Sequence, residues 1–446
     1  MMPASRMKAR DDDGAFATVP RIPSTIAILL ALACGVALAL AGRTGALADS
    51  GIFPALTIMT GRIGQLYLNL IQLLTVPLIF VALARATSML FRESRLGRTL
   101  WRATLFALAT SLLGIFVALS AAHLFRPGEA MPSDAAEGLL RMGSHASREI
   151  AGRLPASDNL AVTLLAFVPE TLALIGSGRL YLPVMLLAPL TGLLLGMRTE
   201  AARDLLSDRL ELCYRWLLAI TGRALYFSPL PIGCLIHHLV ATAGLGASGA
   251  LLPYIGVLLL AFTLQLTIVY FAAVWILAGI RPLRFLRSIR EAMLVAFGTS
   301  SSGATLAVSL QLARDRLGIS EPVGRFVLSA GTCLNQAGSA MFLGVSVIFL
   351  AQFFGIALSL WQHLIVIATC SIAAIGTVGV PGASITVIAL TLAMIGVPVE
   401  TISLILGVDR LMDMCRSMLN VTGDLAMAAV LTSGADAGER HPSQDA

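Results

Sequence analysis

The sequence predicts an all-α membrane protein that crosses the bilayer several times. Three observations lead to this class: 57% of the residues are hydrophobic, only 13% are charged, and the mean hydropathy is +0.86. The charges gather in short spans, and the apolar runs between them are long enough to cross a bilayer, which takes about 20 helical residues. A soluble protein of 446 residues would instead divide into domains with polar surfaces.

The first half of the chain consists of long apolar runs with charged connections. The first run follows a basic stretch, but it is long and many more follow, so we interpret it as a retained transmembrane helix and not a cleaved signal. We expect helices near residues 24–42, 55–83, 99–124, 160–197, 210–240 and 252–279.

The second half contains two interrupted apolar segments, separated by a continuous helix expected near 323–352. In AMLVAFGTSSSGATLAVSL (292–310) and in the segment 364–398, two short apolar arms flank a tip of small residues. Irregular backbone at membrane depth is tolerated only where it is buried in protein or lines a watery cavity. Two such segments in matching positions favour a transporter's binding site over a pair of kinked helices.

The formal charge of +6 comes from arginines that punctuate apolar segments and do not line one surface. This distribution argues against nucleic acid as a partner and indicates cytoplasmic loops under the positive-inside rule. The two clusters are Arg85, Arg92, Arg95, Arg98 and Arg102, and Arg281, Arg284, Arg287 and Arg290.

The last apolar stretch carries a charged seam. In LMDMCRSMLNVTGD (411–424), Asp413, Arg416, Ser417, Asn420 and Asp424 have the spacing of one helix face. An ionisable residue at mid-membrane costs about 2.5–3.5 kcal/mol on insertion scales, so the seam requires a compensating partner. One interpretation is a purely structural ion pair between Asp413 and Arg416. We favour a bound ligand with co-ions, because the pair alone leaves Asn420 and Asp424 without a purpose.

The residue types in the seam indicate which ligand it would select. Asp413 can hold an ammonium group, and the planar fork of Arg416 suits a carboxylate. Asn420 and backbone N–H groups at the serine tip can hold a second carboxylate. A ligand with one ammonium and two carboxylates would match all of these groups, and an acidic amino acid has this composition. Asp424 remains, and its oxygens suit a hard cation such as sodium.

Four motifs give the chain a family resemblance: FGTSSSGATLAVSL (297–310), NQAGS (335–339), GTVGVPGAS (376–384) and DRLMDMCRSMLNVTGD (409–424). The sequence resembles the dicarboxylate/amino acid:cation symporter family, which includes glutamate and aspartate transporters, from about residue 25 to 433. The resemblance implies a transporter and not an enzyme, with eight transmembrane helices, two re-entrant helical hairpins and inverted repeats in a glutamate-transporter-like fold. It also implies a homotrimer and elevator-type alternating access.

The resemblance also implies how the chain is organised. A transporter domain lies between two cytoplasmic tails, and the three parts span residues 1–22, 23–433 and 434–446. Scaffold helices fall mainly within about 23–280, with some early helices joining a substrate-binding core at about 285–433. The hairpins lie near 285–312 and 362–397. We expect an integral protein of a bacterial plasma (inner) membrane, in contact with lipid and with both termini cytoplasmic.

The family's pattern assigns roles to individual positions. It places the substrate's ammonium on Asp413, its side-chain carboxylate on Arg416 and its α-carboxylate on Asn420 and the serine tip. The expected substrate-binding residues are Ser301, Ser302, Ser339, Val380, Asp413, Arg416, Ser417 and Asn420. Sodium ions, as co-transported ligands and not cofactors, would be held mostly by backbone carbonyls at Gly331, Asn335, Ile375, Thr377, Asn420 and Asp424. No cofactor is expected.

This chain departs from the family at several positions. The family motif NMDGT is NQAGS here, so an aspartate that helps to hold a further sodium ion has become Ala337. The partner tyrosine of that site corresponds to Ala107. We therefore predict that this sodium site is lost, and that coupling uses fewer sodium ions or protons. An arginine that the family carries at one of two positions is also absent, because those positions are Ser300 and Met414.

Four alternatives compete with this interpretation. A channel or purely structural membrane protein is disfavoured, because a passive pore has no need of a stereospecific Asp/Arg/Asn stripe. A neutral amino-acid symporter is disfavoured by Arg416, and a C4-dicarboxylate symporter is disfavoured by Asp413. An intramembrane serine protease is a different class, suggested by GASG (246–249) with His237 and His238 nearby. Small residues match such a motif easily in a chain with 40 glycines, so we interpret Ser248 as part of a connection between helices.

Overall fold

The computed structural model describes residues 25–43, 52–92, 96–130, 181–198, 200–243, 251–376 and 383–436. Within these ranges the chain forms helices joined by short turns, with no strand. The predicted all-α class is therefore confirmed. In chain order, the helices of the first half are α1 (Thr25–Arg43), α2 (Ile52–Arg92), α3 (Leu96–Phe125), α6 (Tyr181–Gly196), α7 (Glu200–Tyr226), α8 (Pro229–Ala243), α9 (Leu252–Leu264), the π-helix η1 (Gln265–Tyr270) and α10 (Phe271–Ala278).

The second half continues with shorter helices that surround a long last one. They are α11 (Pro282–Thr299), α12 (Ser302–Asp315), α13 (Glu321–Leu334), α14 (Ala337–Phe353), α15 (Leu360–Gly376), α16 (Ala383–Ile395), the 3-10 helix η2 (Val399–Ile402) and α17 (Ser403–Asp436). Helix α17 packs against α10, α11, α12, α13 and α14. Almost all of its side chains from Met412 to Thr432 are buried. This placement keeps the charged seam away from lipid, where its ions would be costly.

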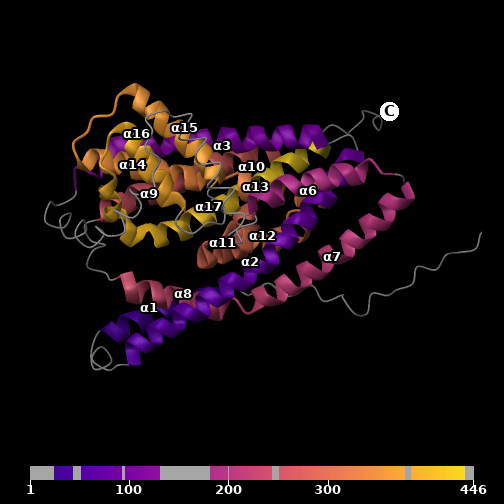
Figure 1. Cartoon of the computed structure of the whole chain (residues 1–446), viewed down its shortest axis with the longest axis horizontal. Helices are drawn as coiled ribbons and strands as arrows, with labels where there is room; N and C mark the ends of the chain where they lie inside the picture. The colour runs from indigo at the N-terminus through magenta and orange to yellow at the C-terminus, as the bar shows by residue number, and fades with distance from the viewer. Residues whose placement is uncertain are drawn as a thin grey trace, which may run out of the picture.

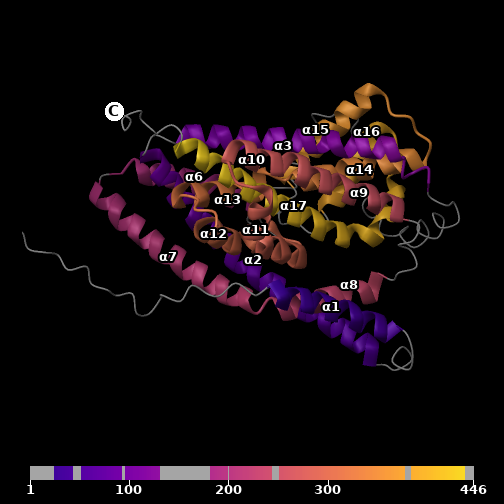
Figure 2. The same cartoon turned by 180° about the vertical axis from the view of Figure 1, so that it is seen from behind.

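Helices α1, α2, α6, α7 and α8 form a second group beside this core, whereas α3 and α9 pack against α14. Helix α2 packs against α6, α7 and α8, and α1 packs against α8. Figures 1 and 2 show α1, α7 and α8 along one side of the molecule and α3 on the opposite side. The two groups meet where α11, α12 and α13 contact α1, α2, α7 and α8.

Two helix pairs correspond to the two interrupted segments. Helix α11 ends at Thr299, and Ser300 adopts a left-handed conformation (φ 52°) that terminates it. The side chain of Ser301 then accepts a hydrogen bond from the backbone N–H of Ala304 at 3.2 Å and caps α12. Helices α15 and α16 form the second pair, and its tip at 377–382 lies outside the described residues.

The expectation of a continuous helix near 323–352 is wrong. Helix α13 ends at Leu334 and α14 starts at Ala337, because Asn335 (φ −99°, ψ 71°) and Gln336 (φ −106°, ψ 42°) leave the helical region. Both side chains have partners that compensate for the break. Asn335 donates to Asp424, and Gln336 donates to the backbone carbonyl of Thr332.

Four of the described helical segments are long and apolar enough to cross a membrane: 52–91, 96–125, 252–278 and 321–353. The bent pair α7–α8 makes a fifth if it counts as one span. The expected fourth run, near 160–197, lies mostly outside the described residues. Eight spanning helices therefore stay a prediction.

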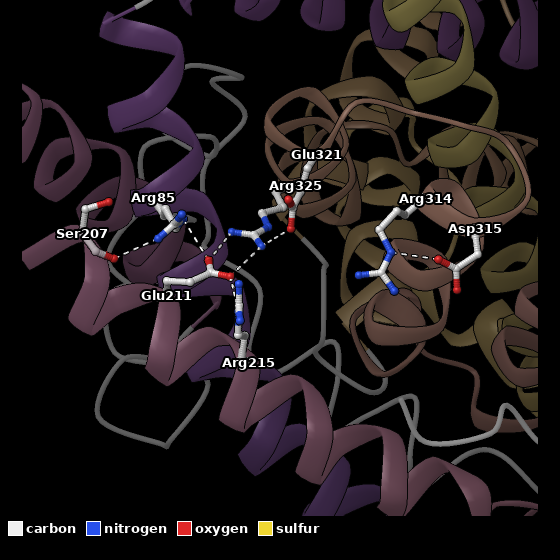
Figure 3. A network of polar contacts seen from close by, with 8 residues as sticks. All are labelled: Arg85, Ser207, Glu211, Arg215, Arg314, Asp315, Glu321 and Arg325. Carbon is white, nitrogen blue, oxygen red and sulfur yellow. Dashed lines mark hydrogen bonds and ion pairs between the residues drawn. The ribbon is translucent and has the colours of Figure 1, made fainter. Parts of the chain in front are cut away.

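An ion-pair network joins the two groups of helices around the carboxylate of Glu211 in α7 (Figure 3). Its oxygens lie 3.0 Å from Arg85 Nε of α2, 2.8 Å from Arg325 Nη1 of α13 and 2.7 Å from Arg215 Nε of α7. Arg325 also pairs with Glu321. Because Arg325 is only 4% exposed, its charge depends on these carboxylates.

We predict that Glu211→Gln lowers the stability of the protein by at least about 2 kcal/mol, because Arg85 and the buried Arg325 then lose a shared counter-charge. The midpoint of thermal unfolding in detergent measures the change. Asp315→Asn is the matched control, since the Asp315 carboxylate pairs with Arg314 at 2.8 Å while both side chains are about half exposed. Its effect should stay below about 0.5 kcal/mol, and equal shifts for the two variants would contradict the prediction.

Candidate functional site

The centre of the candidate site is an ion pair between two residues of α17. Arg416 donates to Asp413 Oδ1 from Nε at 2.9 Å and lies 2.8 Å from the same oxygen through Nη2. The internal ion pair, which was the alternative interpretation of the seam, is therefore present. The Arg416 side chain is 8% exposed and that of Asp413 is 16% exposed. The second oxygen of Asp413 lies 3.5 Å from Arg410 Nη1.

Arg416 has two further contacts that bring other helices to the seam. Its Nη1 donates to Ser384 Oγ of α16 at 2.6 Å, and its guanidinium lies over the ring of Phe342 in α14, 4.8 Å from the centroid. A cation over an aromatic face gains electrostatic stabilisation. Ser384 was not among the predicted site residues. It closes the motif GTVGVPGAS, so the signal was in the sequence, but the pattern alone does not show that this serine faces Arg416.

One turn further along α17, Asn420 belongs to a closed cluster of amides and a hydroxyl. Its Nδ2 donates to Gln336 Oε1 at 2.6 Å and to Ser339 Oγ at 3.1 Å, while its Oδ1 accepts from the N–H of Gly338 at 2.8 Å. Ser339 also donates to Gln336 Oε1 at 3.2 Å. The structure thus joins two predicted substrate residues, Ser339 and Asn420, through Gln336. The sequence marked Gln336 only as a departure from the family motif.

The end of the seam provides oxygen atoms for a cation. Asp424 Oδ1 accepts from Asn335 Nδ2 at 3.1 Å, and it lies so close to Gly331 that a Cβ added there would be 2.7 Å away. Thr110 Oγ1 lies 3.4 Å from Asn335 Oδ1. Carboxylate, amide, hydroxyl and backbone oxygens are the ligands that hard cations prefer. The structure brings Gly331, Asn335 and Asp424 together, and their role in binding sodium stays a prediction.

The other predicted residues have varied positions. Ser301 uses its hydroxyl to cap α12, and Ser302 and Ser417 are both buried. Ile375 lies in the last turn of α15. Thr377 and Val380 lie outside the described residues. The binding roles of all the predicted substrate and sodium residues stay predictions.

The residues that suggested a serine protease serve packing. His237 Nδ1 lies 2.9 Å from Thr60 Oγ1, and His238 Nδ1 lies 2.9 Å from the backbone oxygen of Thr57. Both contacts join α8 to α2. Ser248 falls outside the described residues.

A family model described as "Sodium:dicarboxylate symporter family" matches residues 25–433, which is most of the chain. The chain belongs to the sodium:dicarboxylate symporter family. The predicted resemblance is confirmed. Because this family consists of transporters, the chain is not an enzyme.

Relatives within the sodium:dicarboxylate symporter family match over most of their own length. The chain is 29% identical to the proton/sodium-glutamate symport protein of Bacillus subtilis, covering 85% of this chain and 87% of the relative. It is 26% identical to the proton/glutamate-aspartate symporter of Escherichia coli, covering 82% of this chain and 83% of the relative. It is 29% identical to a C4-dicarboxylate transport protein of Paraburkholderia phymatum, covering 85% and 88%.

We predict that Gly338→Ala disrupts the close packing of α14 against α17. A Cβ at Gly338 would lie 2.8 Å from the backbone oxygen of Arg416 and 2.9 Å from Asn420 Oδ1, so α14 would have to move away from α17. Overpacking of this kind costs about 1–3 kcal/mol, which a lower midpoint of thermal unfolding would reveal.

Gly344→Ala in the same helix is the matched control. Its new Cβ would meet only the flexible side chain of Leu119, at 3.3 Å, and alanine has a higher helix propensity by up to about 1 kcal/mol. The prediction is wrong if Gly338→Ala is as stable as Gly344→Ala.

Proposed function

We propose that this chain is a symporter that carries acidic amino acids, glutamate or aspartate, across the membrane together with cations. The observation that carries the proposal is the buried arrangement of Arg416, paired with Asp413 and hydrogen-bonded to Ser384. It places one fixed cation and one fixed anion side by side within a core made of α14, α16 and α17.

The ion pair supports selection of the substrate by exchange. A ligand that separates Asp413 from Arg416 must supply a new partner to Arg416, because an uncompensated buried charge costs about 3–5 kcal/mol. Asp413 keeps Arg410 at 3.5 Å from its second oxygen and loses its closer partner, which an ammonium group would replace. An acidic amino acid supplies both, with its side-chain carboxylate on the fork of Arg416 and its ammonium on Asp413. Without substrate, Asp413 takes the place of the substrate's carboxylate at Arg416, and Arg416 takes the place of its ammonium at Asp413.

The same reasoning separates the alternatives within the family. A neutral amino acid would satisfy Asp413 and leave Arg416 without a counter-charge. A C4-dicarboxylate would satisfy Arg416 and add a further negative group beside Asp413. The relatives named for glutamate and for C4-dicarboxylates match to similar extents, so support for an amino acid comes from Asp413.

The coupling ions are part of the proposal. Asp424 with Asn335 and Gly331 supports one sodium site. Ala337 and Ala107 lack the side-chain oxygens that the family uses at a further site, and neutral oxygens alone seldom compensate for the dehydration of a cation. We infer coupling to fewer sodium ions, or to protons. The relatives' names mention both ions.

The proposed mechanism is the elevator, with eight spanning helices and with α11–α12 and α15–α16 as re-entrant hairpins. Its support is the grouping of the helices (Figures 1 and 2): the first pair contacts α1, α2, α7 and α8, whereas the second packs on α3, α13 and α14. A first hairpin at the border between the two groups suits a core that moves against a scaffold. We further propose a homotrimer in the bacterial inner membrane with both termini cytoplasmic.

We predict that purified protein in liposomes accumulates radiolabelled aspartate or glutamate when a sodium or a proton gradient is imposed, each in a separate experiment. Arg416→Ala should abolish uptake, because the side-chain carboxylate loses its partner. Arg314→Ala, which removes an exposed arginine of α12, should leave uptake unchanged. Equal uptake of alanine, or of succinate, by the unaltered protein would overturn the substrate assignment.

We also predict that Gln336→Leu raises the KM for the transported amino acid by at least about tenfold, because Asn420 and Ser339 lose the acceptor that orients them. Gln336→Asn keeps a neutral side-chain amide with an acceptor oxygen and should retain more of the affinity. Initial uptake rates over a range of substrate concentrations separate KM from maximal rate. Unchanged KM in both variants would mean that Gln336 only fills space.

A further inference from the structure

Two histidines from separate helices meet at the edge of the core. His123 lies in the last turn of α3, and His363 lies in the first turn of α15. Their Nε2 atoms are 2.8 Å apart and their ring centroids 4.9 Å apart. Neither residue belongs to the seam on α17, and the proposed transport cycle does not use them.

The hydrogen bonds around the pair determine where the protons are. His363 Nδ1 lies 2.8 Å from the backbone oxygen of Ser359. A carbonyl oxygen only accepts, so Nδ1 of neutral His363 carries the hydrogen and its Nε2 presents a lone pair. His123 Nε2 must then donate to that lone pair. When the proton on His123 Nε2 moves to Nδ1 of the same ring, the lone pairs of both Nε2 atoms point into the space between the two rings.

We propose that His123 and His363 form a surface site for a divalent transition-metal cation of the zinc, nickel or copper type. Neutral imidazole is a preferred ligand for these ions, with zinc–nitrogen distances of about 2.0–2.1 Å. A separation of 2.8 Å needs to widen by only a few tenths of an ångström to admit the ion between the two nitrogens. The bond from His363 Nδ1 to a carbonyl oxygen is the same anchor that orients metal-bound histidines.

The surroundings are compatible with an exposed metal site completed by water. His123 is exposed, and Arg126, three residues along the chain, pairs with Glu129 at 3.2 Å. Glu129 therefore offsets the positive charge that would otherwise oppose the ion. Phe125 and Trp361 are largely exposed apolar neighbours, which is typical of the membrane–water interface.

Metal binding here would join α3 to the base of the second helix pair. Gln362, next to His363, donates to the backbone oxygen of Ile395 at the end of α16 at 2.9 Å. An ion on His363 therefore restrains α15 and α16 together. Arg416 donates to Ser384 Oγ of α16, so a substrate carboxylate that binds Arg416, as the proposed function requires, has to displace α16, and an ion that restrains α15 and α16 slows uptake.

The test is isothermal titration calorimetry of the tag-free, full-length protein in detergent with zinc chloride. Zinc should bind in the micromolar range, and His123→Ala or His363→Gln should each weaken binding by at least about tenfold. His441→Ala is the matched control, because it removes a histidine of the C-terminal tail. Zinc should also raise the thermal unfolding midpoint of the unaltered protein and of the control, but not of the two site variants.

Equal zinc affinity in all four proteins would overturn the site. Liposome uptake gives a second readout that rests on the proposed function: zinc should inhibit the unaltered protein and not His363→Gln, and equal inhibition of both would overturn the restraint. Uptake without zinc keeps the two proposals distinguishable, since the histidine variants should transport normally. Loss of acidic amino-acid uptake in every protein would contradict the proposed function and leave the calorimetric result standing.

Discussion

The burial of one positive charge, that of Arg416, is the constraint on which the rest of the core depends. In a low-dielectric interior this guanidinium is tolerated only with close partners. The chain supplies a carboxylate from α17 itself, a hydroxyl from α16 and an aromatic face from α14. Three helices that are distant in sequence are thereby held at one point. In the proposed function, the same requirement makes the site selective, because whatever displaces an internal partner must supply a comparable one.

The second condition is close approach between α17 and the broken helix α13–α14. Gly331 and Gly338 lie at the positions where a Cβ would meet Asp424 and Asn420. The break at Asn335 and Gln336 turns side-chain amides and backbone N–H groups toward the seam and away from the helix ladder. Backbone groups at the break and side chains of the seam therefore satisfy each other's hydrogen bonds, as the Gly338 N–H and Asn420 Oδ1 do. No polar group of this cluster needs water at membrane depth.

The sequence predicted those features that depend on local pattern. Helical spacing placed Asp413, Arg416 and Asn420 on one face, and the tip TSSSGAT indicated the turn between α11 and α12. It did not predict contacts made across the fold. Ser384 reaches Arg416 from 32 residues away, and Gln336 reaches Asn420 from 84 residues away. Apolar periodicity carries no information on such pairs, and it also made α13 and α14 look like one continuous helix.

The two departures from the family motif at residues 336 and 337 together change the charge and the hydrogen bonding beside the seam. Where the family places an aspartate beside a cation, this chain has Ala337, and the preceding residue is a glutamine instead of a methionine. The glutamine carries no net charge, and its oxygen is already saturated by donors from Asn420 and Ser339. A neutral, internally satisfied hydrogen-bond cluster thus stands where the family has a negative charge. In the proposed function, this difference removes the attraction for one cation and keeps Ser339 and Asn420 oriented. Because Asp424 is the carboxylate that remains next to Asn335, the proposed cation coupling of this chain rests mainly on a single buried acidic group.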